Sequence, residues 1–326
     1  MMRASANRIA FGALVLLAVT ASLPAFAQKL PSRPIRIMLP FAAGSVSDVT
    51  VRILADKLSQ RLGISVLVDN QPRAGGISAV TTTLTSPPDG TTLVVLSSST
   101  AISVSLLKSL PYDPVKDFIP VSGISTFANI IATNAGSRFE SLNALLADAR
   151  AHPGKLNIGT TTVGSTNHLA ANLLRSTAQV DFVIVPFRTP GELITGALRN
   201  DVDAIIQSFG ALKSAIEGKQ LRALAGTTGT RAPYAPTVPT VDEAGMKGFE
   251  VVTWNGFFAV NGTPPKLVDL LNREIRATLD DPELRSRFLD LGLEPLPGTP
   301  AELRDRLVRE IGKWAKVIAD AGIEQQ

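Results

Sequence analysis

Two segments of the sequence carry residue types that could bind an anion, and both follow the same plan. Residues 39–48 read LPFAAGSVSD and residues 158–168 read IGTTTVGSTNH. Each runs from the expected end of a strand, through small and hydroxyl residues, into the expected start of a helix. A helix N-terminus presents unpaired N–H groups and a partial positive charge, which bind anions. Two such loops in one chain predict a shared anion site.

The same residues also have a structural interpretation. Residues 45–48 read SVSD, an S-x-x-D pattern in which Ser45 and Asp48 would satisfy backbone groups at the start of a helix. Ser165 or Thr166 could cap the second helix in the same way. We therefore interpret Asp48 as a capping residue rather than as a catalytic acid.

The rest of the sequence offers little that could catalyse a reaction. It contains no cysteine and two histidines, His152 and His168, which are not spaced as a metal-binding pair. Neither a G-x-S-x-G motif nor a Walker-type glycine-lysine loop occurs. His168 could be a base for Ser165, but no acid stands nearby to orient it. We expect no enzyme activity, no catalytic residue, no metal and no cofactor, and interpret His168 as a ligand contact or a hydrogen-bonded structural residue.

The N-terminus predicts export. Arg3 and Arg8 are followed by an apolar stretch from about Ile9 to Leu23 and by Ala25-Phe26-Ala27, the pattern of a signal peptide cleaved near Ala27. We therefore expect a periplasmic or secreted protein. Cleavage would remove two arginines and no acids, so the formal charge of +4 falls by two. Without basic clusters, this balance argues against nucleic acid as a partner.

The elements that must position the two loops form an alternating series, which predicts an α/β fold with parallel sheets and crossover helices. A chain of this length is expected to form two domains. Residues 299–302 read TPAE, a capping box that begins a helix with a continuous apolar stripe, and Trp314 in that stripe is interpreted as a core residue. The expected strands are 34–39, 65–68, 92–96, 156–159, 183–186, 202–207 and 221–225, and the expected helices include 46–62, 77–84, 141–151, 166–176, 192–198 and 211–217.

Several motifs resemble those of the Bug-type solute receptors, the extracytoplasmic binding proteins of tripartite tricarboxylate transporters. The resemblance runs from about Pro31 to Gly322. The segments that carry it are PSRPI (31–35), PFAAG (40–44), VDNQPRAGG (68–76), LPYDPVKDF (110–118), PGKLN (153–157) and VPTVDEAG (238–245).

The resemblance implies a type II periplasmic-binding-protein fold, with two α/β lobes joined by two hinge strands. After a signal peptide at 1–27, the first lobe would comprise residues 28–125 plus 228–326, and the second lobe residues 126–227. The implied function is a periplasmic solute-binding protein for a small carboxylate: a di- or tricarboxylate, an acidic amino acid or an aromatic acid. Its implied partner is the membrane permease of a tripartite tricarboxylate transporter.

The family's binding residues can be carried over to matching positions. They are Phe41, Ala42, Gly44, Ser45 and Ser47 from the first loop, Thr161, Gly164, Ser165, Thr166 and His168 from the second, and Ser98 and Thr100 at a further strand end. The sequence departs from the family at Ser45, where a second glycine is usual, and at 187–189, where Phe-Arg-Thr replaces Tyr-Lys-Gly. Both departures put the usual ligand set in doubt.

Arg188 is one further candidate for ligand binding, and the pattern of the strand before it suggests this role. Val183 to Val185 is expected to be a buried strand that Pro186 ends, so Arg188 would lie on a loop at a strand's carboxyl end, where α/β sheets bind ligands. Its planar guanidinium suits a second carboxylate on the ligand, while a solvent-facing position is the alternative.

Two functions remain open at this point. A transport receptor and a co-receptor that presents the same ligand to a sensor kinase both need only binding and lobe closure. The sequence does not distinguish them, and it does not identify the ligand.

Overall fold

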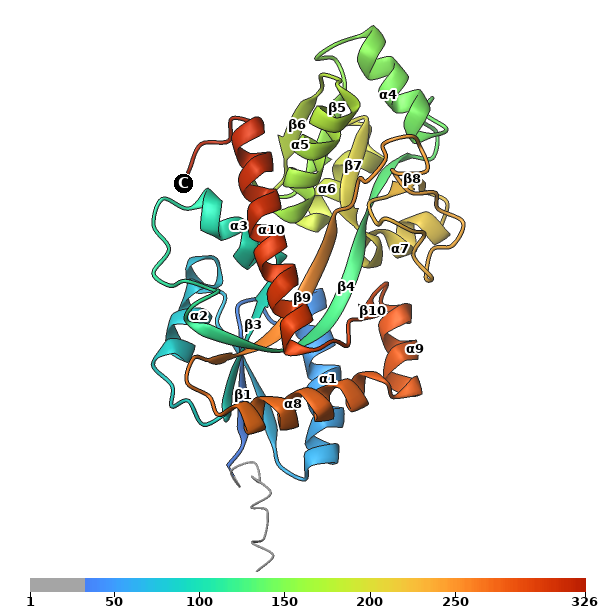
Figure 1. The fold of residues 1–326 in the computed structure, drawn as a ribbon. Helices are drawn as coiled ribbons and strands as arrows, with labels where there is room; N and C mark the ends of the chain where they lie inside the picture. Colours follow the sequence, from blue (N-terminus) through green and yellow to red (C-terminus); the bar gives the residue numbers. More distant parts are fainter. Residues whose placement is uncertain (1–32) are drawn as a thin grey trace, which may run out of the picture.

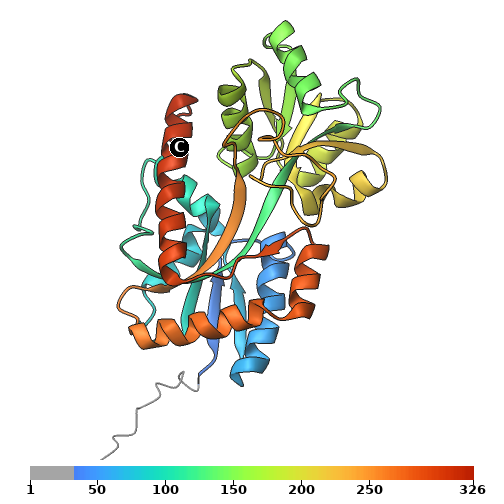
Figure 2. The same cartoon turned by 45° about the vertical axis from the view of Figure 1, so that its right-hand side comes forward.

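The computed structural model describes residues 33–326 and shows a two-lobed α/β protein (Figures 1 and 2). The expected signal peptide lies outside the described residues. The elements are β1 (Ile35–Leu39), α1 (Val46–Leu62), β2 (Val66–Asn70), η1 (Arg73–Gly76), α2 (Ile77–Leu84), β3 (Thr92–Ser97), α3 (Ser98–Leu106), β4 (Phe118–Asn134), α4 (Leu142–Ala151), β5 (Asn157–Thr160), α5 (Thr166–Ala178), β6 (Val183–Pro186), α6 (Pro190–Leu198), β7 (Ala204–Ser208), α7 (Phe209–Glu217), β8 (Leu221–Gly226), β9 (Val252–Val260), α8 (Pro265–Leu279), α9 (Pro282–Asp290), β10 (Glu294–Pro295) and α10 (Pro300–Asp320).

The strands form two parallel groups joined by two long antiparallel strands. The order is β2-β1-β3-β9-β4-β7-β5-β6, with β8 and β10 also paired to β4. Strands β1, β2 and β3 are mutually parallel in one lobe, and β5, β6 and β7 are parallel in the other. Strands β4 and β9 pass between the lobes side by side (Figure 1). The predicted α/β class with crossover helices and two hinge strands is confirmed.

The register of β4 turns the carboxyl ends of both parallel groups toward each other. β3 and β4 are both antiparallel to β9, so they run in the same direction. Asn255 of β9 is paired with Ser97 at the end of β3 on one side and with Ser125 of β4 on the other. β7 runs antiparallel to β4 and ends at Ser208, opposite Asn129. Ser125 and Asn129 are four residues apart on β4, or about 13 Å. The strand ends that carry the two loops therefore face one another between the lobes.

Local capping explains why the main helices begin and end where the sequence predicts. Helix α1 starts after Ser45 and ends at Gly63, which adopts the left-handed conformation that glycine tolerates. Thr299 and Glu302 form the predicted capping box of α10. Trp314 is fully buried in the core, and its indole N–H donates to Glu310 on the preceding turn, 2.7 Å away.

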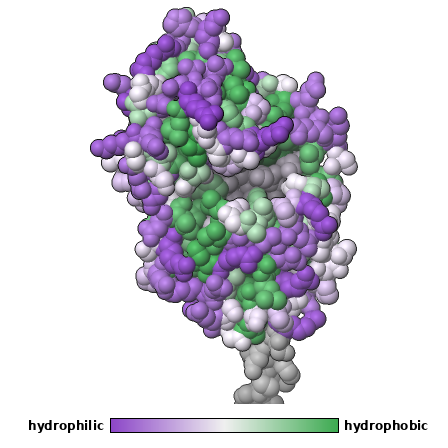
Figure 3. Space-filling model, turned by 180° about the vertical axis from the view of Figure 1, so that it is seen from behind, coloured by the Kyte–Doolittle hydropathy of each residue, from purple (hydrophilic) through white to green (hydrophobic). Residues whose placement is uncertain are grey.

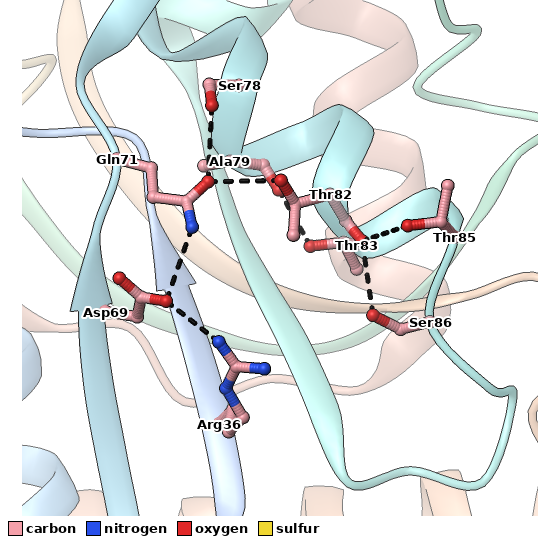
Figure 4. Close-up of polar contacts among 9 residues, drawn as sticks. All are labelled: Arg36, Asp69, Gln71, Ser78, Ala79, Thr82, Thr83, Thr85 and Ser86. Carbon is pink, nitrogen blue, oxygen red and sulfur yellow. Dashed lines mark hydrogen bonds and ion pairs between the residues drawn. The ribbon is translucent and has the colours of Figure 1, made fainter.

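Polar contacts anchor α2 to the edge of the first lobe's sheet (Figure 4). Arg36 of β1 donates to Asp69 of β2 at 2.9 Å, and Gln71 donates to the same carboxylate at 3.3 Å. The carbonyl oxygen of Gln71 accepts from the hydroxyls of Ser78 and Thr82 on α2. This network fixes the chain that packs beside the first loop.

Two features differ from the local pattern. The sequence pattern does not predict the long strands β4 and β9. Strand β4 contains Pro120 and Gly123, and its pairing with β9 shifts register near both residues. Strand β6 was expected to be buried, which is wrong. It is the edge strand of the second lobe, and Val183 on it is 46% exposed.

The connection between β8 and β9 packs against the second lobe. Ala235 and Val238 contact the apolar cluster that contains Leu193 and Leu212, and the Tyr234 hydroxyl accepts from the Ala128 N–H at 2.8 Å. These contacts favour a lobe boundary near 251 rather than at 227/228, and the division of the chain into lobes remains a prediction.

Ser98 ties the first helical turn of α3 to strand β9. Its buried hydroxyl donates to the Val252 carbonyl at 3.3 Å and accepts from the Trp254 N–H at 3.0 Å. Ser98→Ala should lower the free energy of unfolding by about 1–3 kcal/mol, because it leaves a buried N–H unpaired. Ser99→Ala on the same turn is exposed and should cost little. Urea denaturation measures both, and equal losses would contradict this role.

Candidate anion-binding site

The two loops identified from sequence have nearly the same backbone. Gly44 and Gly164 adopt φ angles of 79° and 80°. Ser45 (φ −67°, ψ 160°) and Ser165 (φ −68°, ψ 158°) follow them as the N-caps of α1 and α5. The left-handed φ explains why glycine stands immediately before the N-cap serine in both loops. The prediction that the loops are one structural device used twice is confirmed.

Both caps use a serine hydroxyl for the helix N–H, but the N–H of the preceding glycine has a different acceptor in each loop. The Ser45 hydroxyl accepts from the Asp48 N–H at 3.2 Å, and the Ser165 hydroxyl accepts from the His168 N–H at 3.3 Å. The preceding glycine N–H donates to Asp48 Oδ2 at 2.8 Å in the first loop, and to His168 Nδ1 at 3.4 Å in the second. The capping role of Asp48 is confirmed. At the starts of α1 and α5, the N–H groups of Val46, Ser47, Thr166 and Asn167 have no acceptor within residues 33–326, which leaves them available to an anion.

Asp48 is held behind the first loop by several donors. Its Oδ1 accepts from Arg52 Nε at 3.0 Å and from Asn70 Nδ2 at 2.8 Å, and Asn70 also donates to the Phe41 carbonyl. Burial raises the pKa of Asp48, but the hydrogen bonds from Gly44, Asn70 and Arg52 outweigh burial and lower the pKa below its ordinary value. Asp48 therefore keeps its negative charge and fixes the loop.

The second loop is held by neutral groups. The Thr161 hydroxyl contacts the Ser165 hydroxyl at 3.1 Å and donates to Asn167 Oδ1 at 2.7 Å, while Asn167 donates to the Ile206 carbonyl at 3.0 Å. Burial and then the positive charge of Arg175 lower the pKa of His168. A neutral ring that accepts at Nδ1 carries its proton on Nε2. His168 is therefore a hydrogen-bonded residue that positions the loop.

The loops lie at the facing strand ends, next to apolar and hydroxyl groups of α3. A Cβ placed on Gly164 would collide with the Leu106 side chain, so the second loop packs closely against the first lobe. Beside the first loop is a cavity of about 250 Å³, and Phe41 and Thr100 both line it. Ser98 does not line this cavity, and its hydroxyl is already bonded to β9 on both sides. In Figure 3 apolar side chains gather around the waist between the two lobes.

Sequence reasoning missed four polar residues on the strands between the loops. They are Ser125, Asn129, Gln207 and Asn255, all buried, and each has a side-chain atom without a hydrogen-bond partner among the described residues. Buried polar atoms are rarely left unpaired except where function requires it. The sequence feature that could have identified them is a polar residue within an otherwise apolar strand, as in the segment AIIQS of β7.

Arg188 lies two residues beyond the end of β6. Pro186 is opposite Thr160 in the sheet, and the Phe187 N–H donates to the Thr160 carbonyl at 2.8 Å, so Arg188 begins the loop beside the second anion loop. Its side chain is exposed, and its backbone N–H donates to Glu192 at 3.3 Å. Within residues 33–326 the guanidinium makes no hydrogen bond or ion pair.

Within the described residues, no group of three or more possible metal ligands comes together, and no helix is long and apolar enough to cross a membrane.

A two-lobed α/β chain with paired anion loops at its facing strand ends has the architecture of a solute-binding receptor. Residues 50–323 match the family described as "Tripartite tricarboxylate transporter family receptor". The chain belongs to this family, and the resemblance to Bug-type receptors is confirmed.

Individual relatives agree with this assignment. Protein BugT of Bordetella pertussis is 34% identical over 301 residues, which cover 92% of each chain. The structure described as "R. palustris Rpa4515 with adipate" is 30% identical and superposes with a TM-score of 0.79, covering 91% of this chain and 99% of that one. MatC from Rhodopseudomonas palustris with bound malate is 30% identical with a TM-score of 0.74, covering 88% and 99%.

The buried imidazole of His168 makes stability depend on pH. Because its folded pKa lies below the unfolded value of about 6.5, the unfolded chain takes up the proton first as pH falls. Its contribution should be fully present above about pH 6.5 and decline below it. Urea denaturation from pH 5 to 8 should show this decline in the wild type and in the exposed-site variant His152→Gln, and less of it in His168→Asn. An equal decline in all three would place the titrating group elsewhere.

Proposed function

We propose that this protein is a periplasmic receptor that captures a small carboxylate and delivers it to the membrane permease of a tripartite tricarboxylate transporter. The observation that carries the proposal is the pair of matched loops at facing strand ends. Each loop offers free backbone N–H groups at a helix N-terminus, the donor set that suits a carboxylate. Membership of the receptor family supports the proposal, as do the relatives whose structures hold adipate and malate.

The proposed contacts come from both lobes. They are the residues carried over from sequence, except that Ser98 acts through β9: Phe41, Ala42, Gly44, Ser45, Ser47, Thr100, Thr161, Gly164, Ser165, Thr166, His168 and Arg188. Gly44, Gly164 and His168 position the free donors rather than supply them, because the glycine N–H groups are already bonded.

Binding would close the lobes around the ligand. The loops belong to different parallel groups, so one ligand bridges them only when the lobes approach, a hinge motion common in periplasmic binding proteins. The register shifts in β4 lie near Gly123 and Ile131, on either side of the point where the strand passes between the lobes. Irregular pairing at these positions lets the strand bend.

The first test is a thermal-shift screen of the chain from Gln28 onward against malate, adipate, succinate and citrate. A ligand that binds the folded state stabilises it by about 2.7 kcal/mol at a concentration of 100 Kd, so the melting temperature should rise with concentration. The uncharged diamide of adipate is the control and should produce no shift. If no carboxylate shifts the transition, or the diamide shifts it equally, the proposed ligand class is wrong.

Arg188 should select ligands with a second carboxylate. Arg188→Met should weaken binding of a dicarboxylate by about 1.5–3 kcal/mol, the scale of a charge-assisted hydrogen bond, and affect a monocarboxylate of the same length much less. Arg199→Met, at the other end of α6, removes another exposed arginine and should change neither. Calorimetry with adipate and hexanoate compares the two effects. Equal weakening of both ligands would show that Arg188 does not read the second carboxylate.

A further inference from the structure

The two lobes touch on both sides of the hinge strands. Successive residues of a strand point to opposite faces. In the second lobe Ile205 packs in the apolar cluster of α6 and α7, whereas Ile206 packs in the cluster of α3, α5 and α10. In the first lobe Val95 packs with α1, α8 and α9, and Val94 packs in the cluster of α3 and α10. Helices α7 and α9 therefore lie on one side of β4 and β9, and α3 and α10 on the other (Figure 1).

On the side of α7 and α9 the lobes meet backbone to backbone. A Cβ placed on Gly210, in the first turn of α7, would lie 2.5 Å from the Leu291 carbonyl oxygen, just after α9. A Cβ placed on Gly292 would lie 2.7 Å from the Phe209 ring. This α7–α9 contact, between residues 209–213 of the second lobe and 290–292 of the first, leaves no room for a side chain at either glycine.

Two further interactions strengthen the α7–α9 contact. Lys213 of α7 donates through Nζ to the Asp290 carbonyl at 2.9 Å. A cation is favourable at this place, because the carbonyl groups at the C-terminus of α9 carry partial negative charge. Phe209 also packs on Tyr234, with ring centroids 5.0 Å apart, so the connection between β8 and β9 supports the contact from behind.

The backbone at Gly210 does not by itself require glycine. Gly292 adopts a φ of 72°, in the left-handed region, so its turn favours glycine whatever surrounds it. Gly210 lies outside that region, within a helix, where alanine is more favourable than glycine. The obstacle to a side chain at position 210 is the Leu291 carbonyl of the other lobe.

On the other side of the hinge strands the second loop touches the first lobe. A Cβ placed on Gly164 would collide with the Leu106 side chain of α3. Contacts on both sides, one of them made by a binding loop, require that the lobes have approached each other. The α7–α9 contact therefore belongs to the approached arrangement of the lobes.

We propose that Gly210 and Gly292 are positioning residues that allow the lobes to close, so that the α7–α9 contact sets ligand affinity through the lobes. The inference rests on the proposed function and adds a control of its affinity. A side chain at position 210 must separate α7 from Leu291, which raises the free energy of the closed arrangement relative to the open one. The apparent Kd equals the intrinsic Kd divided by the fraction of binding-competent protein, so affinity falls with the closed population.

The test compares alanine at two equivalent helix positions. Gly210 and Gly191 are the second residues of α7 and α6, in the same lobe, but a Cβ placed on Gly191 meets no atom within 4 Å. Gly210→Ala should weaken binding of malate or adipate by about tenfold, the factor by which the closed population would fall. Gly191→Ala should change affinity by less than about twofold. Calorimetry gives the affinities, and thermal unfolding without ligand checks that both variants are folded.

A distance measurement separates lobe closure from a local structural effect. Leu67 on β2 and Val183 on β6 are exposed and lie on the two outermost strands of the sheet, one in each lobe. The sequence contains no cysteine, so Leu67→Cys and Val183→Cys provide the two sites for a dye pair. Without ligand, Gly210→Ala should lower the energy transfer between the dyes, and Gly191→Ala should leave it unchanged. Lys213→Met, which removes the bond to Asp290 and adds no bulk, should lower both transfer and affinity, the latter by about threefold.

The outcomes separate this inference from the proposed function. If a folded Gly210→Ala variant binds as tightly as the wild type or more tightly, or shows unchanged energy transfer, the α7–α9 contact does not support closure. If Gly210→Ala does not fold, Lys213→Met decides by the same two measurements. If the wild type binds no carboxylate in the screen, the proposed function fails, while energy transfer in the unliganded variants still tests the contact.

Discussion

Strand β4 is hydrogen-bonded directly to β7 of the second parallel group and, through β9, is joined to β3 of the first, and the rest of the molecule depends on that register. It pairs with β9 over most of its lower part and with β7 and β8 in its upper part. Because β3 runs with β4 and β7 runs against it, all strands that end in binding loops end toward the middle. Ser125 and Asn129, which mark the two edges, are close enough for a small ligand to reach both. Irregular register near the crossing would allow the bending that the proposed lobe closure requires.

The binding loops depend on local chemistry that is repeated at both edges. A glycine in the left-handed region turns the chain, a serine caps the helix, and the third helical residue accepts the glycine N–H. This arrangement uses the donors that a ligand cannot reach and leaves the first two helical N–H groups free. The acceptor can be Asp48 or His168 with almost no change in backbone, so charge is adjusted independently of shape. This independence allows two loops of nearly equal geometry to carry different charges.

The charged and titratable side chains at the two loops are held by hydrogen bonds within the protein. Asp48 is used structurally, with its oxygens bonded to the loop, Asn70 and Arg52. The ring of His168 accepts from the Gly164 N–H, and within residues 33–326 it makes no hydrogen bond to a carboxylate. What remains is a set of hydroxyl, amide and backbone groups, which discriminate ligands by the number and direction of hydrogen bonds.

The sequence by itself determined whatever depends on neighbours within one helical turn. It predicted the bounds of α1, the capping box at Thr299, and the two loops, because caps and turns are satisfied by residues three or four positions away. The family motifs supplied the two-lobed fold. Only the tertiary structure decided that β4 and β9 pair across more than 100 residues, that β6 is an exposed edge, and that Gln207 and Asn255 each keep one buried side-chain atom without a partner among the described residues. These features depend on which strands become neighbours, and a polar residue in an apolar strand does not reveal what it will face once the sheet has formed.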